Sequence, residues 1–239
     1  MNELTYAGKE LSLFSKAVNW KKYLASKIRP FLGRRVVEVG AGIGATTSIL
    51  CDGLQQEWIC LEPDPVLRNE IDARIAARQL PTCCRTRGGF VKDLDLCLAI
   101  DSFLYIDVLE HIREDRDELQ SAADRLAPGG TVIVLSPAFS FLYSPFDRAI
   151  GHHRRYDKPM LVDLTPRGCR VETIFYLDSV GMVTSIFNKI ALRQLLPSEN
   201  QILFWDRWLI ALSRRADPII GYRVGRSIVC VWKKSAVTE

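Results

Sequence analysis

The chain has 239 residues, which predicts a single domain at roughly 100–200 residues per domain. Hydrophobic residues make up 48% and charged residues 25%, so the composition excludes a disordered chain and a low-complexity or collagen-like architecture. The net charge of +4 is uneven, with +6 in residues 1–35, +4 in residues 201–239 and −6 between them. These basic ends favour an anionic small molecule or a membrane surface as partner. They lack the sustained basic tract with interleaved aromatic residues that is typical of nucleic-acid binders.

No run of about 18 uncharged apolar residues is present, so we expect no membrane span. Residues 1–10 lack the basic and then apolar pattern of a secretory signal, which favours a cytoplasmic protein. The cysteine number is odd and no CxxC pair occurs, so we expect reduced thiols that pack as small hydrophobic groups. These cysteines are Cys51, Cys60, Cys83, Cys84, Cys97, Cys169 and Cys230.

The first third of the chain predicts helix, strand, tight turn and helix. Apolar residues from Trp20 to Phe31 recur every three or four positions, with Asn19 placed to cap a helix. The β-branched run at 34–39 predicts a strand. A glycine-rich turn follows, and residues 45–50 begin the next helix.

Strands and helices then alternate as far as residue 136. The helix at 65–78 is expected to turn Val66, Ile71 and Ile75 inward. Such alternation predicts βαβ units and a parallel sheet that is covered on both faces. The expected strands lie at 57–61, 82–86, 101–106 and 131–136, and a further helix lies at 113–127.

The pattern changes after residue 136. Residues 137–165 are rich in proline, aromatic, histidine and arginine residues, and 180–222 contain two amphipathic helices, at 180–196 and 201–215. Insertions late in an α/β domain lie over the carboxyl ends of the strands. We therefore expect one domain, with an N-terminal helical segment, a cofactor-binding core and a substrate cap. These parts are 1–34, 35–136, and 137–165 with 180–222, and the last two strands are 170–177 and 227–232.

The strongest motif is the glycine turn between the first strand and its helix. Gly40, Gly42 and Gly44 allow a sharp bend and close backbone approach to a ligand, and the helix that follows presents unpaired N–H groups. Glu62 ends the second strand, where a carboxylate can accept two hydrogen bonds from a ribose diol. Together these residues predict a cofactor that contains adenosine.

Two cofactors remain open at this point. Gly40, Gly42 and Ala45 satisfy the GxGxxG/A fingerprint of a nicotinamide dinucleotide. Alternatively, Glu38 and the three glycines form an ExGxGxG loop, in which the acid would repel a diphosphate and favour a cationic aminoacyl sulfonium. Glu38 is the residue that favours the second interpretation.

Four ordered motifs within residues 35–137 resemble the class I S-adenosylmethionine-dependent methyltransferases. They are VVEVGAGIGATT, LEPD, DSFLYIDVLEHI and LAPGGTVIVLSPA. The resemblance implies an α/β, Rossmann-like fold. Its sheet would have seven mostly parallel strands, the last one antiparallel, with helices on both faces.

The resemblance also implies how the chain binds S-adenosylmethionine and the product S-adenosylhomocysteine. Glu62 would bind the ribose, and Asp107 would lie beside the methionine moiety. In many members an acid after the third strand binds adenine, and here Asp93 is the weak candidate. The loop residues Glu38, Gly40, Gly42 and Gly44, with Thr46, would surround the aminoacyl end.

The segment SPFDRAIGHHRRYDKPML resembles a bacterial subgroup with a GHxRRY motif. Its members often look like modifiers of small molecules, glycans or lipid-linked compounds. All three histidines fall in the motifs that are expected to flank the site, and a histidine suits general-base catalysis at a hydroxyl acceptor. The candidates are His152, His153 and His111 for catalysis, with His152 preferred over His153 on the resemblance, and Arg154, Arg155 and Tyr156 for substrate binding.

A divalent metal is a further interpretation of this region. Asp107, Glu110 and His111 share one helical face if the segment is helical, and His152 or His153 would complete a ligand set. The same DVLEHI motif occurs in members of the resembled methyltransferase family that need no metal, so a metal is not favoured.

The sequence therefore predicts a methyltransferase for a small-molecule acceptor, with O-methylation slightly favoured. The alternatives are an NAD(P)-dependent oxidoreductase, a non-catalytic partner subunit and a cyclase on the same scaffold. Apolar residues of the cap helices would line an apolar pocket, touch a membrane or pack on the sheet. They are Ile202, Leu203, Phe204, Trp205, Trp208, Leu209 and Leu212.

Overall fold

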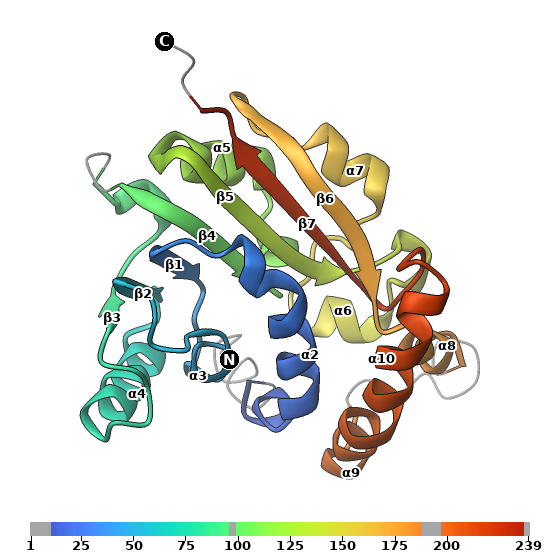
Figure 1. Cartoon of the computed structure of the whole chain (residues 1–239). Helices are drawn as coiled ribbons and strands as arrows, with labels where there is room; N and C mark the ends of the chain where they lie inside the picture. Colours follow the sequence, from blue (N-terminus) through green and yellow to red (C-terminus); the bar gives the residue numbers. More distant parts are fainter. Residues whose placement is uncertain (1–10, 96–98, 188–196, 237–239) are drawn as a thin grey trace.

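The computed structural model describes residues 11–95, 99–187 and 197–236. Its strands form one seven-stranded sheet in the order β3-β2-β1-β4-β5-β7-β6 (Figure 1). β1 to β5 pair in parallel, and β7 runs antiparallel to both β5 and β6. The predicted Rossmann-like sheet with an antiparallel last strand is confirmed. The strands are β1 (Arg35–Val39), β2 (Glu57–Leu61), β3 (Cys84–Arg87), β4 (Ile100–Ile106), β5 (Leu126–Pro137), β6 (Cys169–Leu177) and β7 (Ser227–Lys234).

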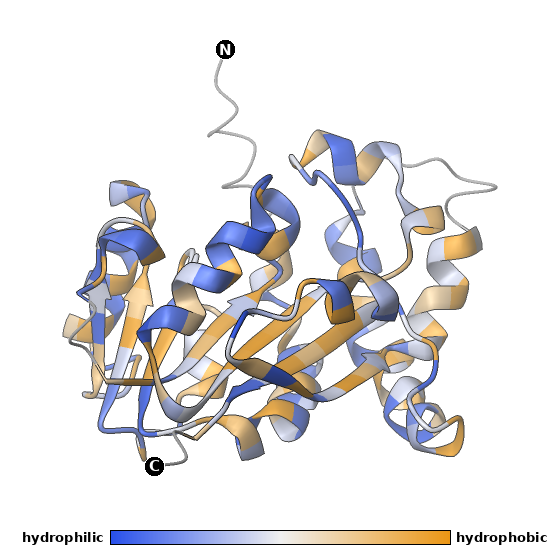
Figure 2. Cartoon of the chain, turned by 90° about the horizontal axis from the view of Figure 1, so that it is seen from above, coloured by the Kyte–Doolittle hydropathy of each residue, from blue (hydrophilic) through white to orange (hydrophobic). Residues whose placement is uncertain are grey.

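Helices cover both faces of this sheet. Two hydrophobic clusters form because neighbouring strand residues point to opposite faces, as Val36 and Val37 do. One cluster joins the sheet to α2, α3, α4, α9 and α10, and the other joins it to α5 and α7. Seen from above, hydrophobic residues concentrate along the strands (Figure 2). The helices are α2 (Val18–Ile28), α3 (Thr47–Leu50), α4 (Pro65–Ala76), α5 (Asp115–Arg125), α6 (Pro145–Ala149), α7 (Lys158–Asp163), α8 (Ser179–Phe187), α9 (Glu199–Phe204) and α10 (Ile210–Ile219).

The strand order places a ligand site at one end of the sheet. β1 has β2 on one side and β4 on the other, so the connections after β1 and β4 leave in opposite directions. In open α/β sheets ligands bind in the crevice outside the carboxyl ends of the strands at such a switch point. The glycine turn, Glu62 and Asp107 directly follow β1, β2 and β4.

Two local predictions are wrong. Ala17, not Asn19, occupies the N-cap position of α2, and the Asn19 side chain instead donates a hydrogen bond of 2.9 Å to Asp206. Val66 is 65% exposed, because it lies in the first turn of α4, where Asp64 caps the helix at the edge of the molecule. Ile71, one turn further on, is fully buried as expected.

The segments predicted as a cap contain α6 and α7 in 137–165 and α8, α9 and α10 in 180–222. Positions 188–196 of the predicted helix 180–196, and Cys97, lie outside the described residues. The other six cysteines are free thiols. A π-helical turn at Trp205–Leu209 joins α9 to α10.

The apolar residues of α9, the π-helical turn and α10 divide between core and surface. Ile202 and Trp205 are buried in the core, and Leu209 packs against it. Among the described residues, no helix has the length and hydropathy needed to cross a bilayer. The side chains with large exposed areas are Leu203, Phe204, Trp208 and Leu212.

Candidate functional site

The glycine turn after β1 adopts a backbone that favours glycine at three positions. Gly40, Gly42 and Gly44 have φ angles of +63°, +58° and +70°, in the left-handed region that other residues rarely enter. A Cβ atom on Gly40 would lie 2.9 Å from a methyl group of Val108. Gly40 and Gly42 line a cavity of about 400 Å³, so bare backbone forms one wall of it.

Glu62 is hydrogen-bonded to this turn. Its Oε2 accepts the N–H of Gly42 at 2.8 Å, and its Oε1 accepts the N–H of Asp64 at 3.0 Å. Burial raises the pKa of Glu62, and the two backbone donors oppose that rise. The two residues that the sequence singled out for an adenosine ligand therefore meet in one wall of the cavity.

Glu38 lies deeper, between the turn and β2. Its Oε2 accepts hydrogen bonds from Thr47 Oγ1 at 2.7 Å and from Trp58 Nε1 at 2.9 Å, which hold α3 against the sheet. Burial raises the pKa of Glu38 to about 7. Both Glu38 and Thr46, the residue before α3, line the cavity.

Asp107 follows β4 on the other side of the switch point. It has a φ angle of +55°, and its N–H donates to the carbonyl of Leu135 at 2.9 Å. Its side chain is open to the cavity, but the surrounding protein limits its hydration and raises its pKa. Nearby positive groups, with His152 and Arg226 first among them, oppose this rise.

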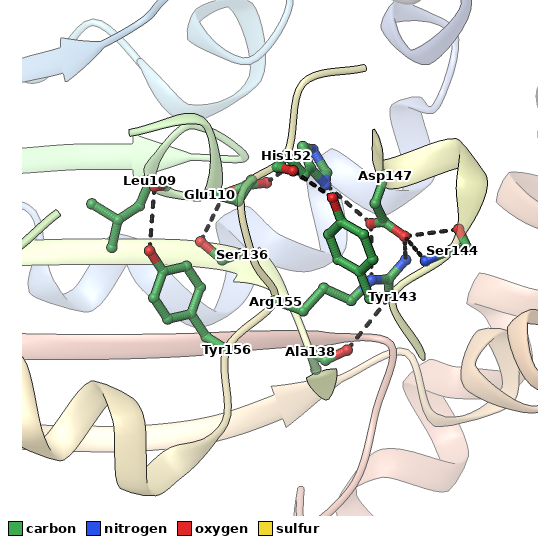
Figure 3. A network of polar contacts seen from close by, with 10 residues as sticks. All are labelled: Leu109, Glu110, Ser136, Ala138, Tyr143, Ser144, Asp147, His152, Arg155 and Tyr156. Atoms are coloured by element: carbon green, nitrogen blue, oxygen red, sulfur yellow. Dashed lines mark hydrogen bonds and ion pairs between the residues drawn. The ribbon is translucent and has the colours of Figure 1, made fainter. Parts of the chain in front are cut away.

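Asp147, in α6, connects several residues on the far side of the cavity (Figure 3). Arg155 donates to both of its carboxylate oxygens, and His152 Nδ1 lies 3.0 Å from Oδ1. Burial alone would raise the pKa of Asp147, but the hydrogen bonds from His152 and Arg155 outweigh it and hold the pKa well below the usual range. Ser144 completes this network through its N–H and its hydroxyl, each 2.8 Å from Oδ2.

His152 lies between two carboxyl groups. Its Nε2 is 3.7 Å from Oε1 of Glu110, on the side opposite Asp147. Glu110 is fully buried, and its Oε2 accepts the hydroxyl of Ser136 at 2.9 Å. Oε1 has no hydrogen-bond partner among the described residues. Burial first, and then the charge of Asp107, raise the pKa of Glu110 well above its usual range.

His111 packs edge-on against His152, with ring centroids 4.6 Å apart. Its ring remains open to the cavity, whereas His152 is buried. Reduced hydration, followed by the charge of His152, lowers the pKa of His111 to about 4. His111 is therefore neutral near pH 7 and has a lone pair available to accept a proton.

Three of the predicted catalytic or substrate-binding side chains do not line the cavity. Arg154 pairs with Asp115 at 2.6 Å, and the fully buried Tyr156 donates to the same carboxylate at 2.8 Å. Both residues thus attach their loop to α5. The His153 side chain is exposed outside the cavity, while its N–H donates to the carbonyl of Glu110.

Arg155 does line the cavity, but Asp147 occupies its guanidinium. Asp93 accepts the N–H of Phe90 at 2.9 Å and does not line the cavity. Asp93 therefore gains no support as the acid that would bind adenine.

Several residues that no sequence motif singled out also line the cavity. Asp147 could have been identified from the sequence. It lies five residues before His152, in a Ser-Pro-Phe-Asp segment that begins a helix, and an acid there can reach the loop that carries His152. Lys21 Nζ donates to the carbonyl of Phe14 at 2.6 Å, and burial lowers the Lys21 pKa to about 8. Arg226, in the turn before β7, belongs to no pattern in the sequence that indicates a site.

Within the described ranges, two clusters have the donor atoms for a metal ion. The ligand atoms of Glu110, His111 and His152 lie within 4.8 Å of one another, and two imidazoles with one carboxylate suit a zinc-type ion. Cys51, Cys83 and Cys84 form the second cluster, away from the cavity. A hydrogen bond with Cys84, followed by burial, raises the pKa of Cys51, and burial raises the pKa of Cys83, which keeps both groups as thiols rather than thiolates.

No protein-family model and no curated protein sequence matches this chain, but solved structures match it. A Galdieria sulphuraria protein described as a sarcosine dimethylglycine methyltransferase is 18% identical, with a TM-score of 0.62 over 92% of this chain and 85% of that one. Geranyl diphosphate methyltransferase with bound S-adenosylmethionine is 11% identical, with a TM-score of 0.61 over 89% and 85%. The (4+2)-cyclase SpnF is 14% identical, with a TM-score of 0.63 over 96% and 95%. These likenesses show the methyltransferase fold, which a cyclase also uses.

Proposed function

We propose that this chain transfers a methyl group from S-adenosylmethionine to a small-molecule acceptor, with a hydroxyl as the favoured acceptor group. The observation that carries the proposal is the composition of one cavity. Gly42, Glu62 and Asp107, the expected donor-binding residues, line it together with His111 and His152. An oxidoreductase would instead need a diphosphate beside Glu38, which is a buried acid at the base of the turn.

The residues present fit an adenosine-bearing sulfonium. When bound, S-adenosylmethionine supplies a methyl group on a good leaving system, so positioning contributes much of the rate. The turn from Gly40 to Gly44 would let the backbone approach the aminoacyl end. Glu62 would exchange part of its hydrogen bonding with Gly42 and Asp64 for the ribose hydroxyls. Asp107 would lie beside the methionine moiety.

His111 is the best placed proton acceptor for a hydroxyl group of the acceptor. It is neutral near pH 7 and its ring is open to the cavity, whereas carboxyl groups lie against both nitrogens of His152. His152 would then position His111 through the edge-on ring contact, and Asp147 would in turn orient His152. A general base with a pKa near the working pH typically contributes about 10²–10⁴-fold to rate, and the lowered pKa of His111 makes it a weaker base that belongs toward the lower end of that range.

Ligand titration and methyl transfer test this proposal together. Calorimetry should detect binding of S-adenosylhomocysteine and no binding of NADH. Incubation with methyl-labelled donor and fractionated metabolites, lipids and glycans should then label one fraction. Tight binding without any labelled product would favour the non-catalytic or cyclase alternative. Binding of NADH in place of S-adenosylhomocysteine would favour the oxidoreductase.

A further inference from the structure

We propose that the acceptor carries an oxyanion, a carboxylate or phosphate on an otherwise apolar small molecule, and that Arg226 binds it. This inference rests on the proposed methyl transfer and names the acceptor class. The sequence pointed to Arg154 or Arg155 for such a contact, but both are occupied by carboxylates of the protein itself. Arg226 lines the same cavity from the turn that precedes β7.

The guanidinium of Arg226 has no hydrogen-bond acceptor in the described part of the chain. It lies over the ring of Trp205, with the guanidinium carbon 5.0 Å from the ring centroid. Asp178 exerts the strongest charge attraction on Arg226, and its backbone carbonyl accepts the Arg226 N–H at 3.0 Å. The Asp178 carboxylate, however, is occupied by Trp205 Nε1, Ser213 Oγ and the N–H of Gly181, at 2.7–2.9 Å.

An arginine in this position can bind an anionic group of a ligand. A guanidinium offers five N–H donors in a planar fork that matches a carboxylate or phosphate. The charges around Arg226 are mixed, because Asp178 attracts it most, Arg155 repels it, and Asp107 and Asp147 attract it less. Partial burial against Trp205 removes water from one face of the fork, which strengthens a charge-assisted hydrogen bond made on the other face.

The sheet order separates Arg226 from the glycine turn and Glu62. The expected donor-binding residues follow β2, β1 and β4, whereas Arg226 precedes β7, two strands beyond β4. At about 4.8 Å between neighbouring strands, that separation is about 10 Å. An anion at Arg226 therefore belongs to the acceptor more readily than to the carboxylate of the donor.

Aromatic side chains also line the cavity that Arg226 lines. Phe146 comes from α6 and Trp205 from the π-helical turn, and Phe14 and Trp20 come from the N-terminal segment. Among the charged residues of the cavity, Arg226 is a cation whose guanidinium has no carboxylate partner within the described chain, so with these aromatic residues it favours a ligand that has an apolar body and a single anionic group. Benzoate and phenyl phosphate are simple probes of that chemistry, and benzamide is the neutral counterpart of benzoate.

The test compares Arg226→Gln with Arg223→Gln. Arg223 is an exposed arginine of the same turn that does not line the cavity, so its substitution removes the same charge nearby. Each protein is titrated with the three probes, with and without S-adenosylhomocysteine. Benzoate or phenyl phosphate should bind wild type and Arg223→Gln at least about ten-fold more tightly than Arg226→Gln, a difference of about 1.4 kcal/mol. Benzamide should bind all three proteins alike.

The affinity for S-adenosylhomocysteine separates this inference from the proposed function. Unchanged affinity in Arg226→Gln, together with the loss of anion binding, supports the acceptor subsite. Loss of S-adenosylhomocysteine affinity in that variant would overturn the inference, because Arg226 would then hold the donor. Equal anion binding to wild type and Arg226→Gln, or none to wild type, would also overturn it while leaving the donor site intact.

Discussion

Arg155 donates two hydrogen bonds of 2.9 Å to Asp147, one to each carboxylate oxygen. Both side chains are buried, and Asp147 also holds Nδ1 of His152. The pair therefore keeps the segment that carries His152 against the cavity, and it leaves Arg155 little capacity to bind a substrate.

Replacing Asp147 with asparagine should destabilise the protein strongly. The substitution leaves the Arg155 charge buried without its partner, a change that costs about 3–5 kcal/mol in comparable ion pairs. Urea denaturation measures this loss. Asp163→Asn is the matched control, since it breaks an exposed pair with Arg116 and should cost about 0–1 kcal/mol. Similar losses in the two variants would show that the buried pair contributes no special stability.

Gly42→Val should weaken binding of S-adenosylhomocysteine by about 100-fold or more, equivalent to about 2.7 kcal/mol. Valine is strained at a φ of +58° and would fill space beside the turn, where its Cβ lies 3.3 Å from Leu11. Calorimetry measures the affinity. Gly168→Val imposes comparable strain at a φ of +77° with no neighbour within 4 Å of the added Cβ. Equal affinity in these two variants would remove the turn from the donor site.

His152→Ala should lower turnover far more than donor affinity. The substitution removes the ring that packs against His111 and the contact with Asp147, so a loss of about 10²-fold or more in kcat is expected. His153→Ala removes an exposed neighbour and should leave kcat close to wild type. Single-turnover rates with the labelled donor provide the comparison. A normal rate in His152→Ala would show that the proton acceptor is neither His152 nor a His111 that depends on His152 for its position.

Glu38→Gln should change how stability depends on pH. The pKa of Glu38 is raised from 4.5 to about 7 by burial, so between these values the native chain retains a proton that the unfolded chain has lost. Stability from this group is present below pH 4.5 and is lost as pH rises through 7. Glutamine keeps an oxygen for Thr47 and Trp58 without that loss.

The melting temperature of Glu38→Gln relative to wild type should therefore rise between pH 5 and pH 8. The expected change is about 2–4 °C for each kcal/mol of ionisation cost removed. Thermal denaturation of both proteins across this range measures it. A difference that stays constant with pH would mean that Glu38 is already ionised at pH 5 in the native chain.

Dialysis against a chelator should leave methyl transfer unchanged. The methyl donor is already activated as a sulfonium, so the proposed step needs no Lewis acid. Glu110, His111 and His152 nevertheless carry ligand atoms close enough to hold an ion. Metal analysis of the purified protein, before and after dialysis, accompanies the assay. Activity that disappears with a stoichiometric metal and returns on adding zinc or manganese would assign these residues to a metal centre.

Much of the fold was predictable because periodicity and glycine placement are local signals. Buried strands such as residues 57–61 and 101–106 are apolar runs between turns, and the structure has strands there within one residue at each end. The positive φ angles of Gly40, Gly42 and Gly44 likewise follow from a turn that only glycine enters without strain.

The sequence could not predict which polar side chains pair with other protein residues and which face the cavity, because this depends on contacts between distant segments. Arg154 and Arg155 are adjacent in sequence, yet one pairs with Asp115 of α5 and the other with Asp147 of α6. The position of Arg226 against Trp205 depends on how the turn before β7 meets the π-helical turn after α9. No spacing rule relates these segments.

A crystal structure with S-adenosylhomocysteine tests the central claim most directly. We predict that the ribose hydroxyls contact the Glu62 carboxylate, that the aminoacyl end lies along Gly40–Gly44, and that the sulfur faces His111 across the cavity. An unoccupied turn in crystals grown at saturating ligand, or the diphosphate of a nicotinamide dinucleotide bound there instead, would contradict the account.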